Sequence, residues 1–280
     1  MHQINIPLTC DFNMKYYFQN SKESCAAGKF PPHIHDSLEI YILLEGEASF
    51  MVERSLYKLR PMNIVITKPN EMHNCIFNSV SCHKYACFWF EPSNDFLFHD
   101  FLMHDFGDGN LCVPCEQDAQ KIESLCRSLD EGSANGDKKW ILCQALQLLY
   151  YIGKNLNAAP YDEVLPKLLR TILDDIHVNL CSIRSLSYFE EKYYIGTDML
   201  NRLFQNFLRI SPKVYIESKR LAYSRLLLER GMSVNEVCET AGFSDYSNYI
   251  RIFRTRFGVT PLQYRLQKIR GETVAEGKQP

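Results

Sequence analysis

The sequence predicts an α+β chain of two domains, an antiparallel β-barrel followed by two helices and then an all-helical domain. Three observations carry this prediction. Short runs of alternating apolar and polar residues occupy the first hundred positions, and two longer runs with helical periodicity follow them. The last third repeats a pattern of helix, tight turn and second helix. With 280 residues, the chain has room for two cores.

Residues 14–91 carry the strands of the predicted barrel. The runs Leu38–Leu44 and Ala48–Val52 flank the turn-like pair Glu45 and Gly46, so we expect these two strands to form a hairpin. Further short strands are expected at residues 56–59, 63–67 and 83–90. Several short strands at close spacing indicate a small antiparallel barrel.

Inside this predicted barrel, His33, His35 and Glu39 share one strand parity, so their side chains can point to the same side of an unbroken strand. His73 follows on a later strand, and three imidazoles with a carboxylate suit Fe, Mn, Ni or Zn. Three interpretations stay open: a bound metal, a pocket for a small organic effector that these side chains hydrogen-bond, or histidines satisfied within the structure. Candidates for an aromatic lining are Tyr16, Tyr41, Phe50, Phe88 and Trp89.

The second of the tandem helical motifs is the clearer one. Ser233 and Glu236 have the spacing of a capping box, which predicts the start of its first helix. Gly242 can take the positive φ of a tight turn, and Gly258 stands where a left-handed C-cap ends the second helix, expected from about Asp245 to Arg256.

The first motif covers residues 186–206, with Leu200, Leu203 and Phe204 on the inward face of its second helix. Between the motifs, Pro212–Glu229 is predicted to be one helix of 18 residues, about 27 Å long. Two recognition helices on such a spacer could reach successive major grooves, which lie about 34 Å apart on one face of a duplex.

Residues 165–266 resemble the DNA-binding domain of the AraC/XylS family of bacterial transcription regulators. The landmarks that match are Leu200–Phe204, Ile210–Pro212, Arg220–Leu221, Ala241–Asp245, Arg251–Phe253 and Phe257–Arg265. Two positions depart from the family pattern. Arg209 stands where the family usually has glycine, so strain is expected at the exit of the first recognition helix. Gly196 replaces the usual serine before that helix, which weakens its N-cap.

The spacing of the histidines, Glu39 and Gly46 resembles the cupin barrel, and also the sensory domain that precedes the DNA-binding domain in many AraC-type regulators. The whole chain therefore looks like a one-component regulator. The resemblance implies a cupin-like effector-sensing barrel over residues 1–110, a helical dimerisation arm over 111–157, a linker over 158–164, the DNA-binding domain over 165–270 and a tail over 271–280.

The resemblance places base-reading side chains on the exposed faces of the two recognition helices. These residues are Asp198, Asn201, Arg202 and Gln205 in the first helix, and Tyr246, Ser247, Ile250 and Arg251 in the second. Arginine can bridge O6 and N7 of guanine, and asparagine or glutamine can pair with adenine. Phosphate contacts are expected from Arg254, Arg256, Lys213 and Lys219.

The charge distribution agrees with this assignment. From Pro166 onward the chain holds 18 Lys and Arg against 12 Asp and Glu, a net charge of +6. The residues before it hold 13 against 21, a net charge of −8. A basic carboxy-terminal half can meet DNA phosphates, and an acidic amino-terminal half should stay away from them.

We therefore expect a sequence-specific DNA-binding transcription regulator rather than an enzyme, controlled by a small-molecule effector held by His33, His35, Glu39 and His73. A sugar is one candidate effector. Expected partners are double-stranded DNA, a second copy of the chain and, if the outcome is activation, RNA polymerase. The alternative is a metal-dependent cupin enzyme or metal sensor fused to a DNA-binding domain. No signal segment or transmembrane run is evident, so a cytoplasmic location is expected.

Overall fold

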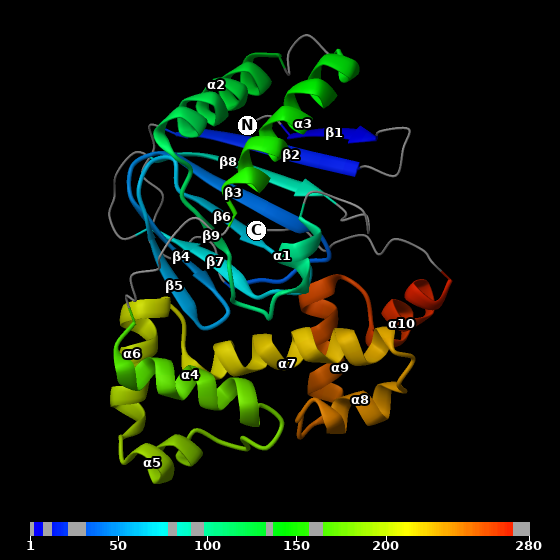
Figure 1. The fold of residues 1–280 in the computed structure, drawn as a ribbon. Coiled ribbons are helices and arrows are strands. Elements are labelled where there is room, and N and C mark those ends of the chain that lie inside the picture. Colours follow the sequence, from blue (N-terminus) through cyan, green and yellow to red (C-terminus); the bar gives the residue numbers. More distant parts are fainter. Residues whose placement is uncertain are drawn as a thin grey trace. The chain divides into compact units, whose positions relative to one another are not determined.

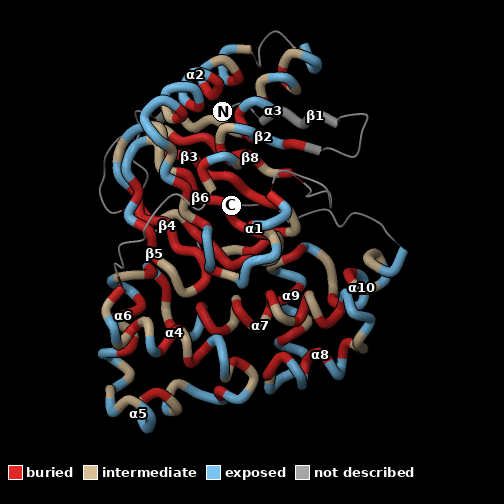
Figure 2. Tube along the Cα trace, in the orientation of Figure 1, coloured by how far each residue is buried: buried red, intermediate tan, exposed pale blue. Residues whose placement is uncertain are grey.

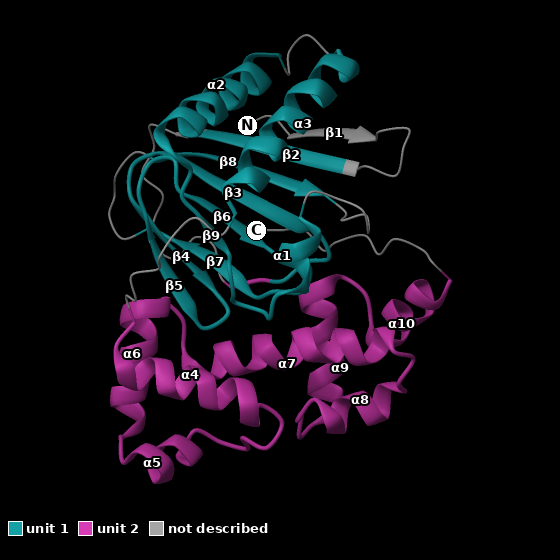
Figure 3. Cartoon of the chain, viewed as in Figure 1, with its two compact units in different colours: residues 1–29, 34–164 teal, residues 30–33, 165–280 magenta. Residues whose placement is uncertain are grey.

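The computed structural model describes residues 3–7, 13–21, 32–77, 83–90, 98–132, 137–156 and 165–270. The chain divides into two compact units, residues 1–29 with 34–164 and residues 30–33 with 165–280 (Figure 3). The predicted linker, residues 158–164, and the predicted tail, residues 271–280, lie outside the described residues. None of the helices in the described ranges has the length and apolar character that a membrane span needs.

The first unit contains antiparallel strands, as predicted, but hydrogen bonding joins them into two sheets and not into one closed barrel. The described strands are β1 (Gln3–Pro7), β2 (Asn13–Ser21), β3 (Leu38–Glu45), β4 (Ala48–Val52), β5 (Ser55–Leu59), β6 (Ile64–Thr67), β7 (His73–Ile76), β8 (His83–Phe90) and β9 (Leu111–Cys112). The larger sheet has the order β1-β2-β8-β3-β6-β9, and the smaller one has the order β5-β4-β7.

The hairpin predicted between β3 and β4 is wrong. Gly46 does turn the chain, with a φ of 92°, but β3 pairs with β8 and β6 while β4 pairs with β5 and β7. This turn passes the chain from one sheet to the other. The hairpin forms one strand later, where Val52 lies opposite Ser55 and Glu53 takes a φ of 52°.

The larger sheet is buried on both faces. Ile40 and Ile42 of β3 pack in one core with Ile122 of α2 (Glu116–Gly132) and Leu148 of α3 (Lys138–Lys154). Figure 1 shows these two helices beside the larger sheet, and Figure 2 shows the buried strands beneath them; the short α1 (His99–Met103) precedes β9. Tyr41 points to the opposite face of β3, where its ring contacts that of Phe50 of the smaller sheet at 4.9 Å. The two sheets therefore meet on this face, and polar groups here lie in an aromatic interior.

The second unit is all helical, and the two predicted motifs are present. Its helices are α4 (Lys167–Asn179), α5 (Ser187–Tyr193), α6 (Thr197–Leu208), α7 (Pro212–Glu229), α8 (Val234–Thr240), α9 (Tyr246–Phe257) and α10 (Pro261–Ile269). The motifs are α5 with α6 and α8 with α9, and α7 connects them. The capping box of Ser233 and Glu236 is formed, and Gly258 ends α9 with a φ of 76°.

The two departures from the family pattern have visible consequences in the first motif. Arg209 ends α6 in the left-handed conformation with a φ of 57°, which disfavours a residue with a Cβ. Gly196 supplies no side-chain cap to α6. A carboxylate oxygen of Glu190 on α5 accepts instead, from the amide of Thr197 at 2.9 Å and from its hydroxyl. The cap of the recognition helix thus comes from the preceding helix.

A close backbone contact joins the turn of the second motif to the segment that follows α4. Gly242, in the turn between α8 and α9, has a φ of 82°, and a Cβ at this position would lie 2.9 Å from the carbonyl oxygen of Cys181. The guanidinium of Arg220 on α7 donates to the carbonyls of Leu180, at 3.2 Å, and Ile183. The segment after α4 is therefore held by α7 and by the turn of the second motif at the same time.

Candidate DNA-reading surface and effector site

The structure brings the predicted base-reading residues to the solvent-facing sides of α6 and α9. On α6, Asp198, Arg202 and Gln205 are exposed and Asn201 is half-buried. On α9, Tyr246, Ser247, Arg251 and Arg254 are exposed and Ile250 is half-buried. The apolar residues Leu200, Phe204, Tyr249 and Phe253 are buried on the opposite faces, which confirms the predicted helical periodicity.

The amino-terminal turn of α9 orders one of these arginines. The carboxylate of Asp245 accepts from the amide of Asn248 at 2.6 Å and so caps the helix. The Asn248 side chain in turn accepts from Nη2 of Arg251 at 2.7 Å. Sequence reasoning did not single out Asn248, although its place three residues before Arg251 could have indicated this contact. Arg251 therefore has a preferred orientation before any DNA arrives.

The cations predicted to contact phosphate do not share one environment. Lys213 and Arg254 are exposed, Arg256 is half-buried, and Lys219 is only 8% exposed. Lys219 lies on the inner face of α7, where it has little access to a phosphate. The phosphate contact predicted for Lys219 therefore has the least structural support of the four.

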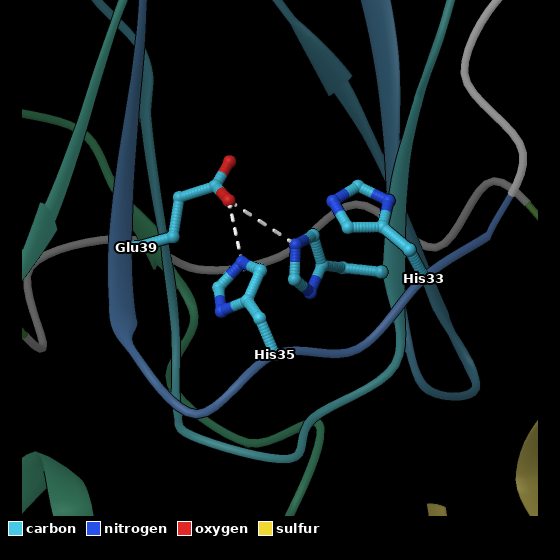
Figure 4. A group of neighbouring side chains, drawn as sticks. His33, His35 and Glu39 are labelled. Carbon is cyan, nitrogen blue, oxygen red and sulfur yellow. Dashed lines mark hydrogen bonds and ion pairs between the residues drawn. The ribbon is translucent and has the colours of Figure 1, made fainter. Parts of the chain in front are cut away.

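The four predicted effector ligands, of which His35, Glu39 and His73 belong to the first unit, have their ligand atoms within 4.8 Å of one another (Figure 4). Oε2 of Glu39 lies 2.8 Å from Nε2 of His35 and 3.3 Å from Nε2 of His73. The indole of Trp89 donates to the same oxygen at 2.6 Å. Glu39 lies near the start of β3, His73 begins β7 and Trp89 lies near the end of β8, so the cluster draws on both sheets.

Burial and charge act in opposite directions on this cluster. Burial alone would raise the pKa of Glu39, but His73 and the hydrogen bonds from His35 and His73 outweigh it and hold this pKa well below its usual range. Burial would lower the pKa of His73, but Glu39 outweighs it and the pKa is raised. The group is therefore suited to holding positive charge around one buried carboxylate.

Both nitrogens of two imidazoles face oxygen acceptors. Nδ1 of His35 lies 3.0 Å from the carbonyl oxygen of Ser37, and Nδ1 of His73 lies 2.8 Å from that of Glu71. Their Nε2 atoms face the Glu39 carboxylate. A neutral imidazole has one N–H, so with Nδ1 donating to a carbonyl its Nε2 presents a lone pair. A lone pair facing a carboxylate calls for a proton or another cation between the two atoms.

The predicted aromatic residues divide between two regions. Tyr41 and Phe50 contact each other, and the ring of Phe50 stacks on that of His73 at 6.1 Å. Trp89 reaches Glu39. Tyr16 and Phe88, which pair across β2 and β8, instead belong to the core under α2 and α3. Strand parity separates the two groups, so of the five predicted aromatic residues Tyr41, Phe50 and Trp89 lie on the side of the histidines.

A buried brace lies directly behind His73. Nζ of Lys68 donates to the carbonyls of Asp105 and Asp108 at 2.9 and 3.1 Å and lies 3.5 Å from Glu71. The Glu71 carboxylate accepts from Asn110 at 2.7 Å and from the amide of Gly107 at 2.6 Å. Sequence reasoning missed this group, because the sequence alone does not distinguish a buried lysine or glutamate from an exposed one. Through the Glu71 carbonyl, the brace fixes the orientation of His73.

Comparison with known families decides what these two units are. Residues 191–267 match a helix-turn-helix domain, and residues 25–139 match an AraC-like ligand binding domain. The chain belongs to the AraC family of transcription regulators. It is a DNA-binding regulator with a ligand-binding amino-terminal domain, as predicted.

Relatives of this AraC-family chain match along most of their length. The virulence regulon transcriptional activator VirF of Yersinia enterocolitica is 27% identical over 271 residues, which cover 86% of this chain and 93% of VirF. The thermoregulatory protein LcrF of Yersinia pestis has the same identity and coverage. Among solved structures, ToxT from Vibrio cholerae matches 91% of this chain and 97% of its own, at 14% identity and a TM-score of 0.36.

The exposed arginines of this AraC-family reader give a direct test of base reading. Arg202→Ala or Arg251→Ala is expected to cost about 1–3 kcal/mol of binding free energy on a duplex selected from a random library by the wild-type protein, and to relax specificity at one position. Fluorescence anisotropy on the selected duplex and on single-base variants measures both effects. Equal weakening on every duplex, including a scrambled one, would show that the arginine contacts phosphate.

Proposed function

We propose that the cluster of His33, His35, Glu39 and His73 is the effector site of this regulator, and that its occupancy changes which DNA half-sites the protein holds. The observation that carries the proposal is the convergence of these predicted residues on one buried carboxylate between two sheets. An effector can shift DNA binding only by its difference in affinity for the two states. Because VirF is named an activator, we also propose that this chain activates transcription and contacts RNA polymerase.

Two kinds of occupant are compatible with the donor set. An organic effector, such as a sugar, would hydrogen-bond the imidazoles and Glu39. A transition-metal ion is favoured by one specific observation, that Nδ1 of both His35 and His73 meets a backbone carbonyl while Nε2 faces the carboxylate. Metal-binding histidines usually donate their second N–H in this way. Ligand atoms within 4.8 Å of one another suit bonds of about 2.0–2.2 Å to one ion. We propose that such an ion would be sensed, with no catalytic role.

A native mass spectrum of the full-length protein, purified without chelator, tests the proposal. In the metal version, one transition-metal ion per chain is expected, and His35→Ala should lose it. His99→Ala, on the exposed start of α1, is the matched control and should keep it. If the occupant is an organic effector, a bound small molecule should add to the mass of the chain, and this added mass should be absent from His35→Ala. If neither species is found, and DNA binding ignores added Zn²⁺, Fe²⁺, Mn²⁺, Ni²⁺ and a panel of sugars, the cluster is structural.

We propose further that the protein is a dimer through α3. The outward face of this helix carries Cys143, Leu146 and Tyr150, and the last two are 42% and 55% exposed. These residues are three and four apart, so they form one stripe. The outward face of α2 carries only polar or charged residues at Gln120, Glu123, Ser124 and Arg127 among others. A second copy of the chain that pairs its own α3 would cover both stripes at once.

Leu146→Glu is expected to raise the dimer dissociation constant by more than a hundredfold. A buried leucine contributes roughly 1.5–3 kcal/mol, and a twofold interface loses that contribution twice. Sedimentation equilibrium over a range of protein concentrations measures the change. Ser124→Glu, on the outward face of α2, is the control and should leave the constant unchanged. A dimer that resists Leu146→Glu would place the interface on another surface.

A further inference from the structure

A groove of about 300 Å³ crosses the second unit between its two helix-turn-helix motifs. One wall is the segment before α5, including Ile183 and Arg184. The floor is the first half of α7, and the far wall is the turn and first residues of α9, including Phe243 and Asn248. Both motifs therefore contribute to one concave surface.

The walls of this groove are fixed to each other. Arg220, which lines the groove, holds the carbonyls of Leu180 and Ile183. Gly242, next to Phe243, leaves no room for a Cβ against Cys181. A ligand in the groove would therefore meet a preformed surface whose shape depends on both motifs.

The groove borders the amino-terminal end of α9. Recognition helices of this kind present their amino-terminal residues to base edges, and Asp245 and Asn248 at the start of α9 line the groove. In Figure 1, α6 and α9 both stand with their amino-terminal ends toward the lower edge of the unit, and α7 lies between them. Two helices placed in successive major grooves must span the minor groove between them. Its two rows of phosphates would face the middle of the unit.

The chemistry of the groove fits a sugar–phosphate backbone. Arg184 and Lys213 line it and are exposed, and within the described residues no hydrogen bond or ion pair engages the side chain of either. Among the apolar residues that line the groove, Leu186 and Phe243 are half-buried and offer surface to a deoxyribose, whereas Ile183 and Ile216 are buried. Of the two acidic residues that line the groove, Asp245 is occupied as the cap of α9, and Glu217 is half-buried.

We infer that Arg184 and Lys213 each bind a backbone phosphate of the DNA between the two recognition helices, at a central site that reads no sequence. Each phosphate neutralised by a protein cation releases condensed counterions, so the slope of log K against log salt is about −0.9 per contact. The inference rests on the DNA-binding function of the family and not on the proposed effector site.

The test is binding of the full-length protein to a mixed-sequence 40-base-pair duplex, measured by anisotropy between 50 and 300 mM KCl, about a sixfold range of ionic strength. Arg184→Ala and Lys213→Ala are each expected to weaken binding roughly eightfold at 0.1 M salt and to reduce the slope by about 0.9. The loss should be equal on a scrambled duplex. Lys167→Ala, an exposed cation at the start of α4 outside the groove, should change neither quantity.

Glu217→Gln is a variant that should strengthen DNA binding, whereas a folding defect could only weaken it. It removes the half-buried negative charge from the groove, so it is expected to tighten binding on both duplexes by a few-fold. The inference would be overturned if Arg184→Ala and Lys213→Ala both kept the wild-type slope of log K against log salt. It would also be overturned if their loss of affinity were confined to one duplex sequence. A loss of binding to the effector site leaves these slopes unchanged, so the two proposals fail separately.

Discussion

Lys68→Met is expected to lower the free energy of unfolding of the first unit by about 3–5 kcal/mol, because it leaves the Glu71 carboxylate buried without its cation. Lys68 is 2% exposed and Glu71 is fully buried. The variant also leaves the carbonyls of Asp105 and Asp108 without their donor. Breaking one partner of a buried ion pair is far more damaging than removing both.

Tryptophan fluorescence during urea unfolding measures this loss in the first unit alone, because the two tryptophans of the chain, Trp89 and Trp140, both belong to it. The double variant Lys68→Met with Glu71→Gln is the matched control and should recover part of the loss. A single variant that unfolds like the wild type would mean that Glu71 is protonated in the folded protein. Burial raises the pKa of Glu71, with Lys68 acting against it, so protonation is the physical alternative.

Gly242→Ala is expected to destabilise the second unit by about 2–4 kcal/mol and to weaken binding to a full operator. About 1–2 kcal/mol comes from holding alanine at a φ of 82°. The remainder comes from a Cβ placed 2.9 Å from the carbonyl oxygen of Cys181, a backbone atom that cannot move without displacing the segment after α4. Helical circular dichroism during urea unfolding measures the effect, and the tryptophan signal of the first unit should not move.

Gly231→Ala separates the two contributions. Gly231 has a φ of 85°, nearly the same as that of Gly242, but a Cβ there would meet no atom within 4 Å. Its variant should therefore show the conformational cost without the steric one. If the two alanine variants lose the same stability, the segment around Cys181 yields easily, and the two motifs are not rigidly joined.

In the second unit, the two motifs and the helix between them were predictable, because the signals that define them are local. The Ser233 cap, the Gly242 turn and the Gly258 C-cap each act within a few residues, and the buried face of α9 follows from its own periodicity. Sheet pairing in the first unit was not predictable in the same way. The turn at Gly46 looks the same in sequence whether the next strand returns to β3 or joins the other sheet.

The candidate effector site was predictable in its ligands but not in its surroundings. The spacing of His33, His35 and Glu39 predicted that these residues lie close together. The unbroken strand assumed for them is wrong, because the chain bends at Asp36 and Ser37 and β3 begins only at Leu38. Trp89 was predicted as part of an aromatic lining, but its hydrogen bond to Glu39 was not, because the two residues lie on different strands. The carbonyl oxygens that face each Nδ1 belong to the backbone, which has no sequence signal. Lys68 was equally invisible, since a buried lysine resembles a surface lysine until its partners are known.

The hydrogen bonds from Thr197 to Glu190 cap α6 with a side chain of α5, so these two helices fold as one cooperative unit. In most helices the first turn is secured by its own N-cap residue and can fray or form independently. Here Thr197 is secured by Glu190, which keeps its position only while α5 is folded. Local opening of α5 would therefore unwind the reading end of α6, where Asp198 and Arg202 stand. The first motif should present its DNA-reading residues in full or lose them together, whereas α9 carries its own cap on Asp245 and opens by itself.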